Sequence, residues 1–468
     1  MNRGQITASL ASLLLLAGCA SPALADPPVQ QHTRTQISSG AAPASADALG
    51  APTGPKNVIV MIGDGMGFNQ LDAAALYRHG TTAAQASVPA GGTSRPADNT
   101  PVPELADFDV QLAMRTTQAG GTYDPAAAWT KFGYVLSAPT DSAAAATAMA
   151  TGVKTYNEAI GVGPDRKPRQ NLAELAIATG RKAGVVTTVP FSHATPGSFS
   201  AHDTDRDDYR NIARDQLNSK LSVVMGAGHP WYTDNHNKRS SGRYTYLYQS
   251  DYLKLKAGRT GFRFLSALSS FDRLTRGEAP ARVFGIARVA STLQQQRSGV
   301  TSRPGAQLNP VPTLTTMTRG ALNVLDADPD GLFLLIEGGA IDWSNHANQT
   351  GRLLEETGSF LDAVEAVTEW VETNSSWQET LLIVTADHES GYLTGRGADP
   401  DWTVITGSKG AVPQVSWHSA KHTKQVVPFF ARGRGATGFG EVVVGTDPVR
   451  GAYIDNTSVA RVVRQLWS

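Results

Sequence analysis

The chain has 468 residues and a mass of 49.4 kDa, which suits one large α/β domain with insertions, or two domains. Its 41 Lys and Arg residues balance 41 Asp and Glu residues, and this argues against nucleic-acid binding, which calls for a basic excess. The 41% apolar content supports a sizeable core, and the single Cys excludes both an intramolecular disulfide and a zinc site built from cysteines.

The N-terminus has the pattern of an export signal. A short basic start leads into an apolar stretch that ends in Leu16-Ala17-Gly18-Cys19 and is too short for a stop-transfer helix. We favour a bacterial lipobox, which would place lipid on Cys19, over the alternative of cleavage after Ala23-Leu24-Ala25. Both predict a signal peptide within residues 1–25 and an exported protein that is periplasmic, anchored in the outer membrane, or secreted.

Two stretches rich in Ala, Pro, Ser and Gly show no apolar periodicity. Residues 26–56 are predicted to form a flexible tether, and Thr82–Pro103 a surface loop. The main domain is then predicted to span residues 57–468.

Short apolar runs without polar alternation recur along this domain, which is typical of strands buried on both faces. The runs are Val58–Ile62, Val185–Val189, Leu332–Ile336, Leu381–Thr385 and Val426–Ala431. Helical patterns lie between them, for example at Asn171–Thr179 and Leu353–Thr373. The alternation predicts a three-layer α/β/α sandwich with a large, mostly parallel central sheet. The irregular stretch Leu217–Arg319 is predicted to be an insertion with a small subdomain of its own.

Polar residues of catalytic or metal-binding type accompany each of these runs. They are Asp64 after the first run, His193 and Thr195 after the second, Glu337, Asp342 and His346 after the third, Asp387 and His388 after the fourth, and His418 and His422 before the last. A single Asp after a strand is usually a loop or cap residue. Open α/β sheets, however, bind ligands beyond the carboxyl ends of their strands, so several such residues predict one shared crevice.

The residue types fit zinc, which takes imidazole nitrogen and carboxylate oxygen. Asp342 and His346 are four residues apart and would share one face of a helical turn, although such a pair alone is also typical of helix capping. Asp387 and His388 are adjacent and point in different directions, which favours two metals with different ligand sets.

An alanine-rich segment, Pro139–Thr155, predicts a helix, and Thr140, Asp141 and Ser142 are all residue types that cap helices. A capped helix would by itself explain the segment. In the functional interpretation, Ser142 lies at the helix N-terminus, where backbone N–H groups and the helix dipole favour an alkoxide and an incoming phosphate. A nearby zinc would make this serine nucleophilic.

Taken together, these segments resemble the alkaline phosphatase family. The matching segments run in the family's order and are Asn57–Gly67, Thr140–Thr155, His193–Pro196, Glu337–His346, Thr385–Glu389 and His422–Thr423. The resemblance implies an α/β fold with a crown-like region inserted at about 217–319. It also implies metal-dependent hydrolysis of small-molecule phosphate monoesters, and the family is usually dimeric.

The resemblance also implies roles for individual residues. Ser142 would be the nucleophile that becomes phosphorylated. The implied ligands are Asp342, His346 and His422 for a first Zn²⁺, Asp64, Asp387 and His388 for a second Zn²⁺, and Asp64, Thr195 and Glu337 for a third metal, usually Mg²⁺. His422 is preferred to His418 because Thr423 follows it.

Arg206 occupies the position of the family's phosphate-binding arginine, with Arg210 as the competing candidate. The guanidinium fork would bind two phosphate oxygens, which Lys could not do. Two other positions depart from the pattern of the enteric bacterial enzymes: His193 replaces an Asp, and Trp343 replaces a Lys. Both neighbour the third metal and the phosphate, so the identity of that metal stays open, and Trp343 is equally consistent with simple packing.

The implied mechanism is double in-line displacement, in which Ser142 attacks phosphorus, the alcohol leaves, and water hydrolyses the phosphoserine. A phosphodiesterase or sulfatase of the same superfamily is an alternative, but Ser137–Asp141 lacks the Arg of the sulfatase C/S-x-P-x-R segment. No G-x-S-x-G motif of a serine esterase is present. A non-catalytic lipoprotein that binds phosphate or metal is a further alternative, and Ser142 beside a full set of ligands argues against it.

Overall fold

The computed structural model of the protein describes residues 54–82, 86–88 and 102–468, which all fall within one compact unit. The predicted signal peptide, Cys19 and nearly all of the predicted tether lie outside the described residues, so export stays a prediction. Most of Thr82–Pro103 also lies outside them, although Val88 within it is buried and pairs with Trp402. Across the described ranges, no helix is both long enough and apolar enough to cross a membrane.

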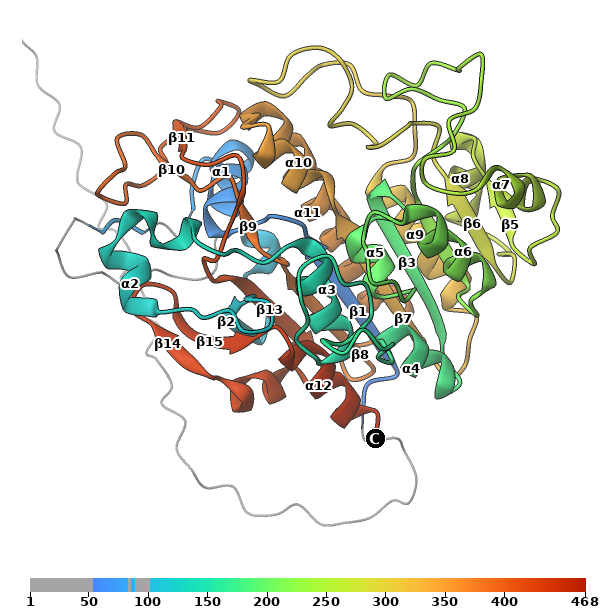
Figure 1. The fold of residues 1–468 in the computed structure, drawn as a ribbon, viewed down its shortest axis with the longest axis horizontal. Helices are drawn as coiled ribbons and strands as arrows, with labels where there is room; N and C mark the ends of the chain where they lie inside the picture. Colours follow the sequence, from blue (N-terminus) through green and yellow to red (C-terminus); the bar gives the residue numbers. More distant parts are fainter. Residues whose placement is uncertain (1–53, 83–85, 89–101) are drawn as a thin grey trace, which may run out of the picture. The chain divides into compact units, whose positions relative to one another are not determined.

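An 11-stranded sheet forms the centre of the described unit (Figure 1). In spatial order its strands are β14 (Gly445–Asp447), β15 (Gly451–Asp455), β2 (Val110–Arg115), β13 (Val427–Gly433), β8 (Thr380–Thr385), β1 (Asn57–Gly63), β7 (Leu332–Gly338), β3 (Lys182–Pro190), β4 (Val223–Ala227), β6 (Val283–Ile286) and β5 (Arg263–Leu265). Two small sheets pair β10 (Leu393–Gly395) with β11 (Val415–Trp417), and β12 (His422–Thr423) with β9 (Glu389–Ser390).

The first four predicted strands are neighbours at the middle of this sheet. β8, β1, β7 and β3 run parallel, and in register Val60 faces Leu335 on one side and Ile383 on the other. Every residue of β1, β7 and β8 is buried, which explains why these strands appear in the sequence as continuous apolar runs. The mostly parallel sheet is therefore confirmed.

The fifth predicted strand, β13, runs antiparallel to both β8 and β2. Its first residue, not its last, therefore lies at the edge of the sheet where β1, β7 and β8 end. This direction explains why the histidine-containing segment that accompanies β13 comes before the strand in the sequence.

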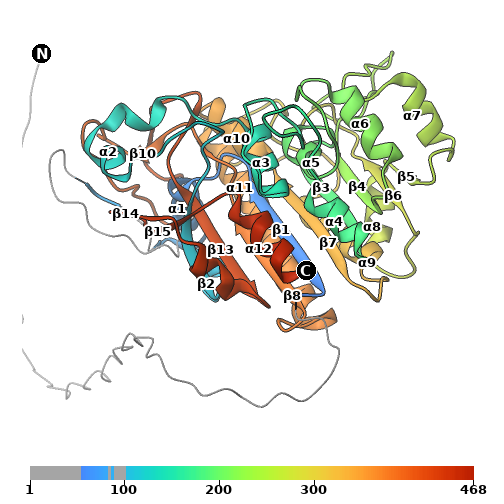
Figure 2. The same ribbon diagram turned by 60° about the horizontal axis from the view of Figure 1, so that its bottom comes forward.

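Helices cover both faces of the sheet (Figure 2). One layer contains α1 (Phe68–His79), α9 (Leu314–Leu325), α10 (Ala340–His346) and α11 (Thr350–Asn374), and the other contains α3 (Ser142–Thr151), α4 (Leu172–Ala178) and α12 (Ser458–Leu466). The remaining α-helices of the described residues are α2 (Pro125–Thr130), α5 (Ala194–Ser198), α6 (Tyr209–Asn218), α7 (Gln249–Lys256) and α8 (Leu268–Leu274), and short 3-10 helices lie at Pro103–Leu105, Phe132–Leu136 and Ala436–Val442. The predicted helices at Asn171–Thr179 and Leu353–Thr373 are confirmed as α4 and α11. Asn171 begins α4 with a capping box that includes Glu174.

The predicted subdomain at Leu217–Arg319 is wrong. This stretch contributes β4, β5 and β6 to one edge of the central sheet, with β4 parallel to β3 and β6 parallel to β4. β4 and β6 are buried along their whole length, but they are short and surrounded by Tyr, Arg and Ser residues, so the sequence pattern did not single them out. The irregular parts of the stretch, 228–248 and 287–313, are mainly loops.

Candidate active site

The predicted site residues gather at the carboxyl ends of the central strands. Ile62 of β1 is in register with Glu337 of β7 and with Thr385 of β8, so Asp64 and Asp387 both follow at the same level. His193 directly precedes α5, which begins beyond β3, and Ser142 is the first residue of α3. Backbone topology alone thus brings together segments that are more than 300 residues apart in the sequence.

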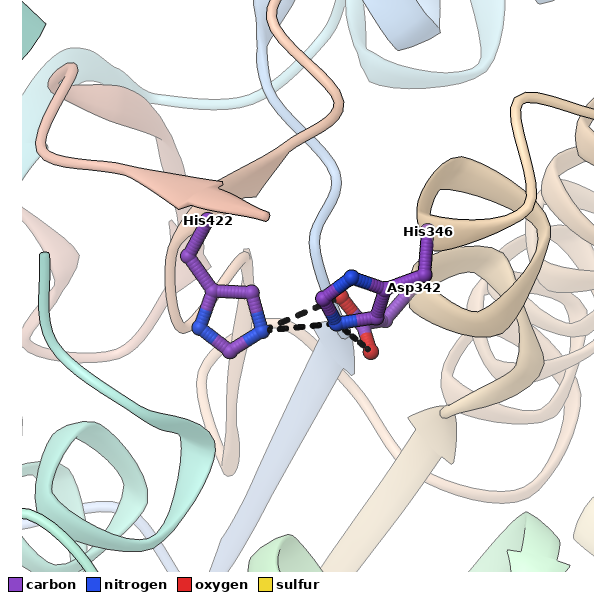
Figure 3. Close-up of side chains that lie close together, drawn as sticks. All are labelled: Asp342, His346 and His422. Atoms are coloured by element: carbon purple, nitrogen blue, oxygen red, sulfur yellow. Dashed lines mark hydrogen bonds and ion pairs between the residues drawn. The ribbon is translucent and has the colours of Figure 1, made fainter. Parts of the chain in front are cut away.

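The first ligand group consists of Asp342 and His346 on α10 and His422 on β12 (Figure 3). His346 Nε2 lies 3.2 Å from Asp342 Oδ2 and 3.0 Å from His422 Nε2. His422 Nε2 in turn lies 3.5 Å from Asp342 Oδ1. Each ring donates its Nδ1–H to a backbone carbonyl, His346 to Ala420 at 2.7 Å and His422 to Thr140 at 2.9 Å. Both Nε2 atoms therefore point at the carboxylate, to which they donate hydrogen bonds when no metal is bound; once deprotonated, the two Nε2 atoms and the carboxylate would form a ligand set that fits a metal ion.

A second group lies beside Ser142 and contains Asp64, Asp342 and His388. His388 Nε2 is 3.1 Å from Ser142 Oγ, 3.2 Å from Asp387 Oδ2 and 3.5 Å from Asp64 Oδ1. Ser142 Oγ is also 3.5 Å from Asp64 Oδ1. The structure therefore brings together all the residues that were predicted for the second zinc, and it adds Asp342 to them.

The third group contains Asp64, His193 and Glu337. Thr187 donates a hydrogen bond to one carboxylate oxygen of Glu337. The other oxygen, the Thr195 hydroxyl and His193 Nδ1 are buried without a hydrogen-bond partner among the described residues. Since unpaired buried polar atoms are costly, this set fits a bound cation. His193, predicted only as a neighbour of the third metal, lies among the ligand atoms themselves.

The electrostatics of these groups point the same way. Burial, together with Asp387 and Asp342, raises the pKa of Asp64 well above its ordinary value. Burial also raises the pKa of Glu337 to about 8, and burial with Asp342 raises that of Asp387 to about 6. Burial works against ionisation of Asp342 as well, but hydrogen bonds from His346 and His422 hold its pKa well below its ordinary value. A divalent cation would offset both the desolvation and the mutual repulsion of these carboxylates.

Ser142 and Arg206 are linked through Asp141. The Asp141 side chain accepts from the Ala144 N–H at 2.9 Å, so it is the N-cap of α3, and it accepts from Arg206 Nη1 at 3.0 Å. Of the three residues that could cap this helix, Asp141 is therefore the one that does so. Ser142 is the first helical residue, and only 1% of its surface is exposed.

The competing candidates lie elsewhere. Arg210 is exposed, with its guanidinium 5.1 Å from the centre of the Tyr248 ring. His418 interacts with Thr394 Oγ1 at 2.7 Å and packs against the Phe132 ring, away from the ligand groups. Position therefore favours Arg206 and His422 over them.

A family model described as alkaline phosphatase matches residues 128–409, and alkaline phosphatase H of Pseudomonas aeruginosa is 30% identical over 79% of this chain and 77% of its own length. The chain belongs to the alkaline phosphatase family. It is therefore a phosphatase, a hydrolase that acts on phosphate monoesters.

Other relatives agree with this assignment. The Escherichia coli alkaline phosphatase is 31% identical over 71% of this chain and 70% of the relative. The streptomycin-6-phosphate phosphatase of Streptomyces griseus is 30% identical over 89% of this chain and 92% of the relative. The alkaline phosphatase of the Antarctic bacterium TAB5 shares the fold, with a TM-score of 0.60 and 24% identity over 88% of this chain and 98% of that one.

Several residues that support the candidate ligands of this phosphatase were not predicted from the sequence. Ser390 donates to Asp342 Oδ1 at 2.5 Å and lies 3.3 Å from His388 Nδ1, so the Nε2 lone pair of His388 also faces the ligand groups. Glu389 accepts from Thr423 at 2.6 Å and from Gln70 at 2.8 Å, and so holds β12 with its His422 against β9. Ser390 lies two residues after His388, which was its only signal in the sequence.

The metal-free phosphatase is expected to lose stability as pH rises from 7 to 9. The folded-state pKa of Glu337 is about 8 against an ordinary 4.5, and that of His346 is about 9 against 6.5. In this window the folded state binds more protons than the unfolded state, so the free energy of unfolding falls by up to ~1.4 kcal/mol per pH unit for each extra proton.

Urea unfolding of chelator-treated protein at pH 7, 8 and 9 measures this slope. Saturating Zn²⁺ should remove it, because the metal takes the place of the protons. Equal stability of the metal-free protein at all three pH values would contradict the assignment of these raised pKa values.

Proposed function

We propose that this phosphatase cleaves phosphate monoesters through a phosphoserine on Ser142, in a site that binds two Zn²⁺ ions and a third metal ion. The observation that carries the proposal is the position of Ser142 Oγ, buried at the start of α3 and 3.1 Å from His388 Nε2. A serine used only to begin a helix would not need an imidazole and a buried carboxylate beside its oxygen.

The donor chemistry supports the metal types. The first Zn²⁺ would be held by Asp342, His346 and His422, and the second by Asp64, Asp387 and His388. The third ion, which the family resemblance implies to be Mg²⁺, would be held by Asp64, Thr195 and Glu337. Two imidazoles in the first group favour zinc, and the oxygens of the third favour magnesium. The nitrogen that His193 adds to this group acts in the opposite direction and suits a transition metal, so the residues present do not by themselves select Mg²⁺. Bound metals would stabilise negative charge on the entering and leaving oxygens.

The chain's own residues perform the rest of the reaction. Arg206, held by Asp141, binds two oxygens of the phosphoryl group and orients it towards Ser142. Ser142 Oγ attacks phosphorus, the new O–P bond forms as the ester O–P bond breaks, and the alcohol leaves with a proton. Water then cleaves the phosphoserine, which releases inorganic phosphate and restores the Ser142 hydroxyl. The N-terminus of α3 stabilises negative charge near Ser142 in both steps.

Activity is expected to disappear after dialysis against a chelator and to return with added Zn²⁺, because the ligand groups contain imidazole and carboxylate but no thiolate. The measurement is colorimetric hydrolysis of p-nitrophenyl phosphate, with metal content determined on the same samples. Bis(p-nitrophenyl) phosphate and p-nitrophenyl sulfate test the diesterase and sulfatase alternatives in parallel. Full activity in protein shown to be free of metal would contradict the proposal.

Ser142→Ala is expected to lower kcat by several orders of magnitude, because the variant lacks the hydroxyl that is proposed to form the covalent intermediate. Mass spectrometry of acid-quenched protein should find phosphate on the Ser142 peptide of the wild type and not of the variant. Ser137→Ala is the matched control, since Ser137 is exposed, lies five residues away, and is the serine of the sulfatase alternative. Wild-type turnover in Ser142→Ala would show that Ser142 is not the nucleophile.

Arg206→Ala is expected to lower kcat/KM by about 30- to 150-fold and to weaken inhibition by phosphate, which corresponds to the loss of about 2–3 kcal/mol from a charge-assisted contact. Arg210→Ala should leave both quantities near those of the wild type, because Arg210 lies against Tyr248. The opposite pattern in the two variants would place the phosphate contact at Arg210.

A further inference from the structure

A continuous series of aromatic rings borders the proposed phosphate position. The Trp343 ring meets the His193 ring edge to face at 5.8 Å between centroids, and His193 stacks on Tyr209 at 6.2 Å. Tyr209 in turn meets Tyr246 at 5.2 Å. We call these four residues the aromatic wall. They come from α10, the start of α5, the start of α6 and the loop 228–248.

The same short segments carry the wall and the reacting groups. Trp343 directly follows Asp342, and Tyr209 lies three residues after Arg206. His193 contributes a ligand atom to the third group, beside Asp64. The wall therefore lies next to the proposed phosphate position, because its central ring, His193, belongs to the third group and both Tyr209 and Trp343 contact that ring.

The backbone of the aromatic wall is fixed by hydrogen bonds, and its side chains remain partly exposed. Gln295 donates to the backbone carbonyl of Trp343 at 3.4 Å, and Ser192 donates to that of Tyr246 at 3.1 Å. The side chains of Trp343, Tyr209 and Tyr246 nevertheless remain partly exposed, whereas aromatic residues of the core such as Phe333 are fully buried. Rings whose backbone is held by hydrogen bonds and which are still partly exposed are suited to bind a ligand at a low cost in conformational entropy.

We infer that the aromatic wall binds the alcohol portion of the substrate and favours phosphate monoesters of planar, aromatic alcohols. The inference rests on the proposed function and adds a substrate class to it. A planar ring can stack on or meet the edges of Trp343 and Tyr209, and such ring pairs are more favourable than burial of the same area alone. A saturated ring of equal size gains the burial but not the ring contact.

The test compares benzyl phosphate with cyclohexylmethyl phosphate, two esters of primary alcohols of similar size and acidity. The wild type should prefer the benzyl ester in kcat/KM, and Trp343→Leu should reduce that preference roughly two- to tenfold. Trp343→Phe should retain part of it. Trp377→Leu is the matched control, because Trp377 lies at the opposite edge of the sheet against Arg432 and should leave the preference unchanged.

The outcomes separate the wall from a structural role and from the proposed function. An unchanged preference in Trp343→Leu, even with both rates reduced, would overturn the inference and leave Trp343 as a packing residue. If Trp343→Leu does not fold, Tyr209→Leu provides the same comparison. A wild type that hydrolyses neither ester would contradict the proposed function instead. Calorimetric binding of benzylphosphonate and cyclohexylmethylphosphonate to the Zn²⁺-loaded protein then tests the wall directly, and equal affinities would overturn it.

Discussion

Buried negative charge at one edge of the central sheet is the constraint on which the rest of this structure depends. Asp64, Glu337, Asp342 and Asp387 are almost fully buried within a few ångströms of one another, and only Asp342 has partners that keep its pKa low. Such a group of carboxylates is unfavourable in a protein interior unless cations accompany it. The surrounding architecture supplies imidazoles whose Nε2 atoms face the carboxylates and whose Nδ1 atoms are bound elsewhere, and it thereby prepares positions for those cations.

Local stability and the proposed chemistry share individual side chains. The Asp141 carboxylate caps the N-terminus of α3 and also binds Arg206, so the same group fixes the position of the proposed nucleophile and that of the proposed phosphate contact. Glu389 similarly bridges α1 and β12 through Gln70 and Thr423, and this bridge places His422 opposite α10. Because these contacts join segments distant in sequence, the geometry of the site is a property of the folded domain and not of any one loop.

The region at 217–319 has a double role in the fold. Its short strands extend the sheet, and its loops run along the edge that carries the site, where Gln295 supports Trp343 and Tyr246 closes the aromatic wall. The candidate catalytic groups therefore lie at the ends of the parallel strands, beside loops that hydrogen bonds hold in place. Ligand binding beyond the carboxyl ends of parallel strands is the general arrangement of open α/β sheets, and here the loops determine what the ester group meets.

The sequence by itself determined the parts that depend on local chemistry. Continuous apolar runs predicted strands buried on both faces, the spacing of Asp342 and His346 predicted one helical face, and the residue types predicted a metal site. Only the tertiary structure decided that β13 runs antiparallel, that β4, β5 and β6 belong to the main sheet, and that His193 lies among the ligand atoms. Hydrophobic periodicity records how deeply a segment is buried but not which segment it pairs with, and each of these decisions depends on a partner far away in the chain.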